Sequence, residues 1–132
     1  MTIQESQSPL TPAQLVQLAL NQVNTLSWEK FLAVRNDPLL LIDVREPAEY
    51  ANGHVPQAVN IPRGTLEFEI AGVPVLKYAR DENPLDYPVY LYCHSGGRSA
   101  LAAQSLQLLG YSNLWSIDGG YARWAKLYPP AT

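Results

Sequence analysis

The strongest constraint on the fold is a short apolar run in which hydrophobic residues are consecutive and do not alternate with polar ones. Residues 39–42 (LLLI) form this run, and residues 58–61, 89–92 and 114–117 are further strand candidates with apolar and β-branched or aromatic side chains. A strand without polar alternation is typical of a parallel sheet that is covered on both faces.

Helical segments alternate with these strands. Thr11 can cap a first helix that has Pro12 at its first position, and Ser27 can cap a second short helix. The remaining helices are expected at residues 46–51, 99–109 and 121–127. This order predicts an α/β fold with right-handed crossovers.

The chain has 132 residues, the size of one ordinary domain. We expect a helical extension at residues 1–24, a globular domain at 25–128 and a tail at 129–132. A long polar connection, from Arg63 to Pro88, joins two of the predicted strands.

The composition excludes several classes of protein. A net charge of −3 provides no basic surface for nucleic acid. No apolar run approaches the ~20 residues that span a bilayer, and the first ten residues do not resemble a secretory signal. We therefore expect a cytoplasmic protein with no nucleic-acid or membrane partner.

The chain contains a single cysteine, Cys93. One cysteine forms no intrachain disulfide and no multi-cysteine metal site. The sequence indicates no metal centre and no cofactor, so Cys93 is expected to act as a lone thiol.

Cys93 directly follows the strand at residues 89–92 and precedes a helix. The glycines Gly96 and Gly97 can take positive φ, which would turn successive backbone N–H groups towards the sulfur. The helix N-terminus and Arg98 add positive charge. A free cysteine is more often a buried core residue, but this surrounding pattern favours a stabilised, reactive thiolate.

Three motifs, in a fixed order, indicate a family. They are residues 41–47 (LIDVREP) continuing through 53–62 (GHVPQAVNIP), residues 93–99 (CHSGGRS), and residues 118–120 (DGG) with Trp124. Together they resemble a single-domain member of the rhodanese homology family over roughly residues 25–128.

The resemblance implies a central parallel sheet with helices on both faces, and a sulfurtransferase that carries sulfur as a cysteine persulfide. Cys93 would be the nucleophile, and the substrate-binding residues would be His94, Ser95, Gly96, Gly97 and Arg98. The sulfur donor would be thiosulfate or a small-molecule or protein persulfide, and the acceptor would be a thiol.

Other residues of the motifs receive supporting or structural roles. Asp43 and Arg45 are expected beside the loop, although Asp43 fits a turn cap equally well. His54 is interpreted as structural, and His94 is given no general-base role. Trp124 is expected to pack the last helix.

The sequence departs from two-domain family members, which tend to place extra cations near the site. Glu49 and Ser95 stand at the corresponding places. This departure weighs against thiosulfate as the physiological donor.

Two alternatives remain open. Cysteine-dependent phosphatases and arsenate reductases also combine a Cys and an Arg, but their loop has one residue more than the four between Cys93 and Arg98, and Tyr92 stands where a His is expected. A non-catalytic interaction module is the other alternative, with the 63–88 connection as its docking surface.

Overall fold

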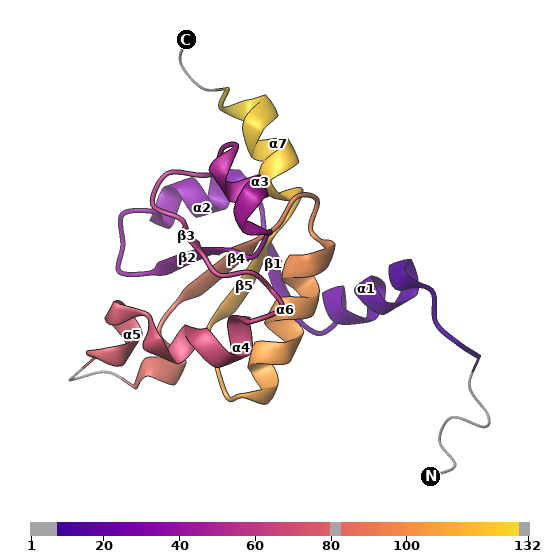
Figure 1. The fold of residues 1–132 in the computed structure, drawn as a ribbon, viewed down its shortest axis with the longest axis horizontal. Coiled ribbons are helices and arrows are strands. Elements are labelled where there is room, and N and C mark those ends of the chain that lie inside the picture. Colours follow the sequence, from indigo (N-terminus) through magenta and orange to yellow (C-terminus); the bar gives the residue numbers. More distant parts are fainter. Residues whose placement is uncertain (1–7, 80–82, 130–132) are drawn as a thin grey trace.

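The computed structural model describes residues 8–79 and 83–129 and contains one parallel sheet (Figure 1). The strands lie in the order β1-β5-β4-β2-β3, and every neighbouring pair is parallel. Their bounds are β1 Asn24–Leu26, β2 Leu40–Asp43, β3 Val59–Asn60, β4 Val89–Tyr92 and β5 Leu114–Ile117. The predicted α/β fold is confirmed.

Helices connect the strands. Their bounds are α1 Pro12–Leu20, α2 Trp28–Val34, α3 Pro47–Ala51, α4 Leu66–Glu69, α5 Pro74–Lys77, α6 Gly97–Leu108 and α7 Gly120–Leu127, with 3-10 helices η2 Ile70–Gly72 and η3 Pro84–Asp86. No helix within the described residues is long and apolar enough to cross a membrane.

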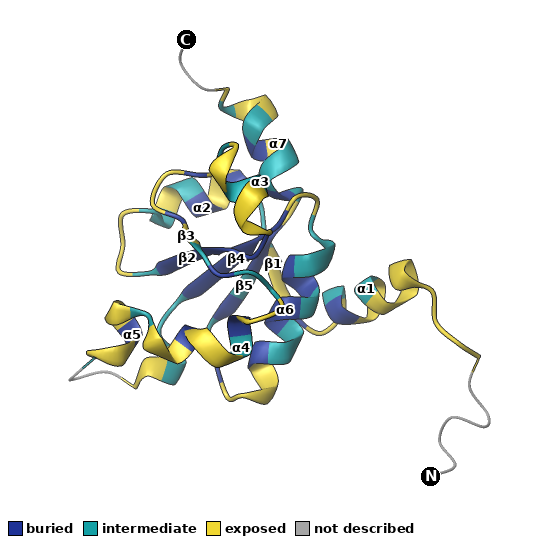
Figure 2. Cartoon of the chain, viewed as in Figure 1, coloured by how far each residue is buried: buried dark blue, intermediate teal, exposed yellow. Residues whose placement is uncertain are grey.

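The sheet separates two hydrophobic cores, because successive side chains of a strand point to opposite faces. Leu40 and Ile42 of β2 belong to one core, together with residues of α4, α5 and α6. Leu41 belongs to the other core, which is dominated by aromatic rings from α2, β4 and α7. Strands β2 and β4 are therefore buried on both faces, as Figure 2 shows by the dark blue centre of the molecule, whereas the edge strands β1 and β3 are exposed or only partly buried.

The first helix begins as its sequence predicts. The Thr11 hydroxyl accepts the Gln14 N–H at 3.1 Å, and the Gln14 side chain accepts the Thr11 N–H at 2.9 Å, which completes a capping box. The helix packs against α6, and Gln22 behind it accepts hydrogen bonds from Gln104 and Gln107 of α6. Helix α1 and Gln22 thus lie against α6, the helix that follows Cys93.

The structure differs from the predicted elements in three places. The 63–88 connection, which was expected to be long and polar, contains α5 and η3 beyond the turns of helix at residues 66–72. Strand β1, at residues 24–26, was not predicted, and it pairs with β5 at the edge of the sheet. Positive φ is found at Gly96 but not at Gly97, which is the first residue of α6, so the prediction for Gly97 is wrong. Residues 1–7 of the expected extension and 130–132 of the expected tail lie outside the described residues, as do 80–82 of the 63–88 connection.

Candidate active site

Cys93 lies at the carboxyl end of β4, where the chain turns into α6, and it is only 1% exposed. Gly96 adopts φ 119° as the N-cap of this helix, and its N–H donates to the Cys93 sulfur at 3.0 Å. This left-handed conformation, which favours glycine, lets the chain turn from the cysteine loop directly into α6.

The sequence predicted that successive backbone N–H groups of the cysteine loop would point at the Cys93 sulfur, and the structure shows one such hydrogen bond. Among the residues that the structure describes, Gly96 is the one whose N–H donates to Cys93 Sγ. His94 and Ser95 are both exposed. Residues from Gly97 onward are helical, so the α6 N-terminus adds its dipole near the sulfur.

Two buried serines, which were not predicted as site residues, lie behind the sulfur. Ser99 Oγ is 3.6 Å from Cys93 Sγ, 3.2 Å from the Gly96 carbonyl oxygen and 2.8 Å from Ser116 Oγ. Both residues are at most 2% exposed. Ser99 stands in the 93–99 motif and could have been found, whereas Ser116 comes from β5 and only the strand pairing brings it here.

The start of α7 holds the first residues of the loop. The Tyr121 N–H donates to the Cys93 carbonyl at 2.7 Å, and the Ala122 N–H donates to the His94 carbonyl at 3.0 Å. Gly120, at φ 54°, lies so close that a Cβ would overlap both carbonyl groups. The start of α7, which follows the 118–120 turn, is therefore the backbone support of the cysteine loop.

Arg98 forms a two-pronged ion pair with Glu49 of α3. Its Nη1 is 2.7 Å from Glu49 Oε1, and its Nη2 is 3.0 Å from Oε2. The hydrogen bonds from Arg98 lower the pKa of Glu49 to about 2. Glu49 in turn raises the pKa of Arg98, as does the nearby Cys93 by its charge. The guanidinium that was expected to bind an oxyanion is thus bound to a carboxylate of the chain.

Asp43 and Arg45 form a second, buried ion pair. Asp43 is 0% exposed; it accepts the Arg45 backbone N–H at 2.9 Å and the Arg45 guanidinium at 2.7 Å. Asp43 therefore caps the turn and also orients an arginine. Arg45 also donates to the Gly53 carbonyl at 2.7 Å and lies against the Tyr121 ring, 4.3 Å from its centre. Arg45 thus joins the first motif to the start of α7.

The remaining residues of the motifs have structural surroundings. His54 stacks on the Tyr50 ring and its Nδ1 lies 3.0 Å from the Tyr50 carbonyl oxygen. Trp124 packs against Trp28 in the aromatic core.

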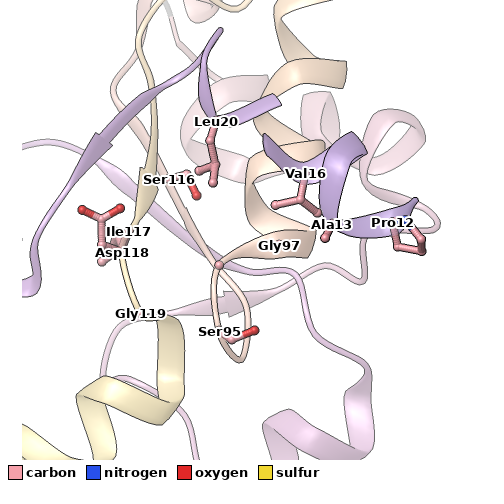
Figure 3. A pocket seen from close by; sticks show the side chains of 11 residues that line it. Pro12, Ala13, Val16, Leu20, Ser95, Gly97, Ser116, Ile117, Asp118 and Gly119 are labelled. Atoms are coloured by element: carbon pink, nitrogen blue, oxygen red, sulfur yellow. The ribbon is translucent and has the colours of Figure 1, made fainter. Parts of the chain in front are cut away.

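A cavity of about 430 Å³ opens between α1 and the cysteine loop (Figure 3). Its apolar wall comes from α1, including Val16 and Leu20, and the opposite wall comes from the 95–97 backbone and the end of β5. Val16 lies over the start of α6, because a Cβ added at Gly97 would be 3.4 Å from a Val16 methyl group. The sequence did not predict this cavity, because it needs α1 placed against the loop.

Fold and site together define a class: α/β proteins with a lone cysteine on a loop between a central parallel strand and the N-terminus of the next helix. The chain matches the Rhodanese-like domain family over residues 27–127 and belongs to that family.

Relatives and solved structures agree with this assignment. The thiosulfate sulfurtransferase GlpE of Pseudomonas entomophila is 32% identical over 113 residues, which cover 86% of this chain and 94% of the relative. The human single-domain sulfurtransferase TSTD1 has a TM-score of 0.66 at 28% identity, covering 83% of this chain and 99% of that one. A Rhodopseudomonas palustris protein of unknown function, described as a possible tyrosine phosphatase, has a TM-score of 0.74 at 28% identity and covers 96% and 100%.

Proposed function

We propose that the protein is a sulfurtransferase that carries sulfane sulfur as a persulfide on Cys93. The main support for this proposal is the hydrogen bond that the Gly96 N–H donates to the Cys93 sulfur at 3.0 Å, at the start of a 12-residue helix. A hydrogen bond to the charged form of a group favours that form, and the helix dipole acts in the same direction. The sulfurtransferase relatives support the same reaction class.

The reaction proceeds in two half-reactions. The Cys93 thiolate attacks the outer sulfur of a donor, the donor S–S bond breaks, and the leaving group (sulfite from thiosulfate, or a thiolate from a persulfide) departs with the electron pair. A nucleophile then attacks the outer sulfur of the Cys93 persulfide and restores the thiolate. The acceptor is a thiol in the cell or cyanide in an assay, and a covalent intermediate of this kind predicts ping-pong kinetics.

The chain's own groups stabilise the anions formed in both steps. The Gly96 amide and the Ser99 hydroxyl are the polar groups at the sulfur. The loop that carries them is fixed by α7, because the amides of Tyr121 and Ala122 bind its carbonyl groups. Such preorganised donors need no rearrangement as charge develops. The proposal includes a cytoplasmic location, where a free thiol such as Cys93 stays reduced.

The proposal is tested by cyanide-dependent sulfur transfer and by mass spectrometry of the protein. Incubation with thiosulfate or a small persulfide should add the mass of one sulfur atom, and cyanide should remove it. Cys93→Ser should show neither the mass gain nor the transfer. Equal transfer rates for the wild type and Cys93→Ser would contradict the proposal and favour the non-catalytic interaction module.

A phosphatase is the second candidate, because the Rhodopseudomonas palustris neighbour is described as a possible tyrosine phosphatase. A phosphoryl group needs several amides around its oxygens, whereas this loop directs the Gly96 amide at the sulfur itself and Arg98 is bound to Glu49. We expect no Cys93-dependent hydrolysis of an aryl phosphate. Hydrolysis that is lost in Cys93→Ser would favour the phosphatase.

A further inference from the structure

The carboxylate of Glu49 binds both terminal nitrogens of Arg98, the guanidinium expected to bind a donor anion. Its two oxygens accept hydrogen bonds from the two terminal nitrogens of Arg98, at 2.7 and 3.0 Å. Its Oε1 also accepts the backbone N–H of Glu46 at 3.0 Å, as part of the N-terminal cap of α3. Glu49 is thus held in place from two sides and is not a loose surface charge.

The charged groups beside the cysteine loop cancel one another. Arg98 pairs with Glu49, and Arg45 pairs with Asp43. Arg45 also acts electrostatically on Glu49, and Cys93 acts on Arg98, so these groups belong to one electrostatic cluster. Two arginines and two carboxylates sum to zero, and a Cys93 thiolate makes the cluster negative. A donor that carries negative charge therefore approaches a site with no net attraction for it.

We propose that Glu49 is a specificity-determining residue that screens Arg98 and makes the site select sulfur donors of low charge over anions such as thiosulfate. This inference rests on the proposed function and names the donor class for it: an uncharged or weakly charged persulfide. An oxyanion gains the Arg98 fork only by displacing a carboxylate that already makes paired, charge-assisted bonds with it. A neutral donor does not need to bind Arg98, so it can react without breaking the ion pair with Glu49.

The decisive variant is Glu49→Gln. It removes one negative charge, keeps the side-chain shape, and retains an amide oxygen that can accept the Glu46 N–H of the α3 cap. Glu29→Gln is the matched control, because it makes the same change at an exposed position of α2.

The first measurement compares an anionic and a neutral reagent of similar size on the same sulfur. The rate constants for alkylation of Cys93 by iodoacetate and by iodoacetamide are taken as a ratio, which cancels changes in thiolate reactivity. In Glu49→Gln the ratio should rise about 5-fold, the upper range for a partly exposed charge pair, and the rise should shrink at high salt. Glu29→Gln should leave the ratio at the wild-type value.

The second measurement adds Arg98→Gln. If Glu49 acts by screening Arg98, replacing Glu49 in the Arg98→Gln background should change the ratio much less than in the wild type. An equal change in both backgrounds, or no change in Glu49→Gln, would overturn the inference.

The donor preference is then measured directly. The kcat/KM for thiosulfate should rise about 5-fold in Glu49→Gln, while kcat/KM for an uncharged alkyl persulfide stays near the wild-type value. An unchanged thiosulfate value would overturn the inference. A wild type that forms no persulfide with any donor would contradict the proposed function instead, and the alkylation ratio would still decide whether Glu49 screens Arg98.

Discussion

The Ser99 hydroxyl lies within hydrogen-bond distance of the Cys93 sulfur on its buried side. It lies between Cys93 Sγ, the Gly96 carbonyl oxygen and Ser116 Oγ. A hydroxyl carries one hydrogen, so Ser99 donates to only one of its neighbours at a time. When the sulfur is ionised, it is the strongest acceptor of the three, and Ser116 can then donate to Ser99 in turn.

Replacing Ser99 should therefore weaken the thiolate. We expect Ser99→Ala to slow alkylation of Cys93 by iodoacetamide near neutral pH by about 5-fold, corresponding to roughly 1 kcal/mol for one lost hydrogen bond. Ser116→Ala should have a smaller effect in the same direction, because Ser116 acts through Ser99. The pH profile of the alkylation rate is the measurement, and Ser112→Ala, at an exposed site on the loop before β5, is the control. An unchanged profile in Ser99→Ala would show that the hydroxyl only fills space.

Gly120 is a position where the structure has no room for one added atom, a Cβ. Its φ of 54° disfavours any side chain, and a Cβ would overlap the Cys93 and His94 carbonyl groups. We expect Gly120→Ala to lower the free energy of unfolding by at least about 2 kcal/mol, from backbone strain together with the overlap. Chemical denaturation measures the loss, and Gly72→Ala, with open space around it and no positive φ, is the control. Equal stability of the two variants would contradict this explanation.

Local patterns explain why most elements, but not all, were predictable from the sequence. Residues 114–117 and 47–51 carry strong strand or capped-helix patterns, and they form β5 and α3. Strand β1 has only three residues, Asn24-Thr25-Leu26, and no apolar run, so its strand conformation depends on pairing with β5. The Arg98–Glu49 ion pair was missed for a related reason. Both residues were noted separately, but their contact depends on α3 being placed beside the start of α6.

Helix α1 lies outside residues 27–127, the part that matches the family, yet its Val16 lies over Gly97, where the cysteine loop enters α6. We expect Val16→Ala to remove this support and to cost about 1 kcal/mol of stability, because the side chain is half-buried. Amide hydrogen exchange at the start of α6 should become faster, since the loop is held less firmly. Leu18→Ala on the same helix is the control, because Leu18 is 45% exposed and should change stability by less than about 0.5 kcal/mol. Equal exchange rates in the two variants would show that α1 does not support the loop.

The charged site lies at the carboxyl ends of β2 and β4, two strands that carry residues of both cores. Residues of one strand serve both faces of the sheet: Leu91 packs on α6 in one core, and Tyr92 packs on Trp28 in the other. Burial raises the pKa of Tyr92, which keeps this phenol neutral while its oxygen accepts the Val55 N–H at 3.1 Å. The Tyr92 hydrogen bond joins β4 to the first motif, and the amides of Tyr121 and Ala122 join the cysteine loop to α7, all at the carboxyl end of the sheet. A change in any of them is expected to affect global stability as well as activity.

The dependence of global stability on pH follows from the carboxylates that are bound in the folded state. The pKa of Glu49 is lowered from 4.5 to about 2 by Arg98, and the pKa of Glu67 is lowered by a hydrogen bond from Ser105. A carboxyl whose folded pKa lies below its unfolded value binds fewer protons in the folded state, so its contribution is complete above the unfolded value and is lost as the pH falls towards the folded one. The free energy of unfolding of the wild type should therefore decrease between about pH 5 and pH 2. In Glu49→Gln this decrease should be smaller, so that the two proteins differ most near pH 6 and converge near pH 2. Denaturation curves across this range measure the difference, with Glu29→Gln as the control that keeps the wild-type slope. A constant offset between the wild type and Glu49→Gln at every pH would mean that the ion pair with Arg98 does not contribute to folding through its charge.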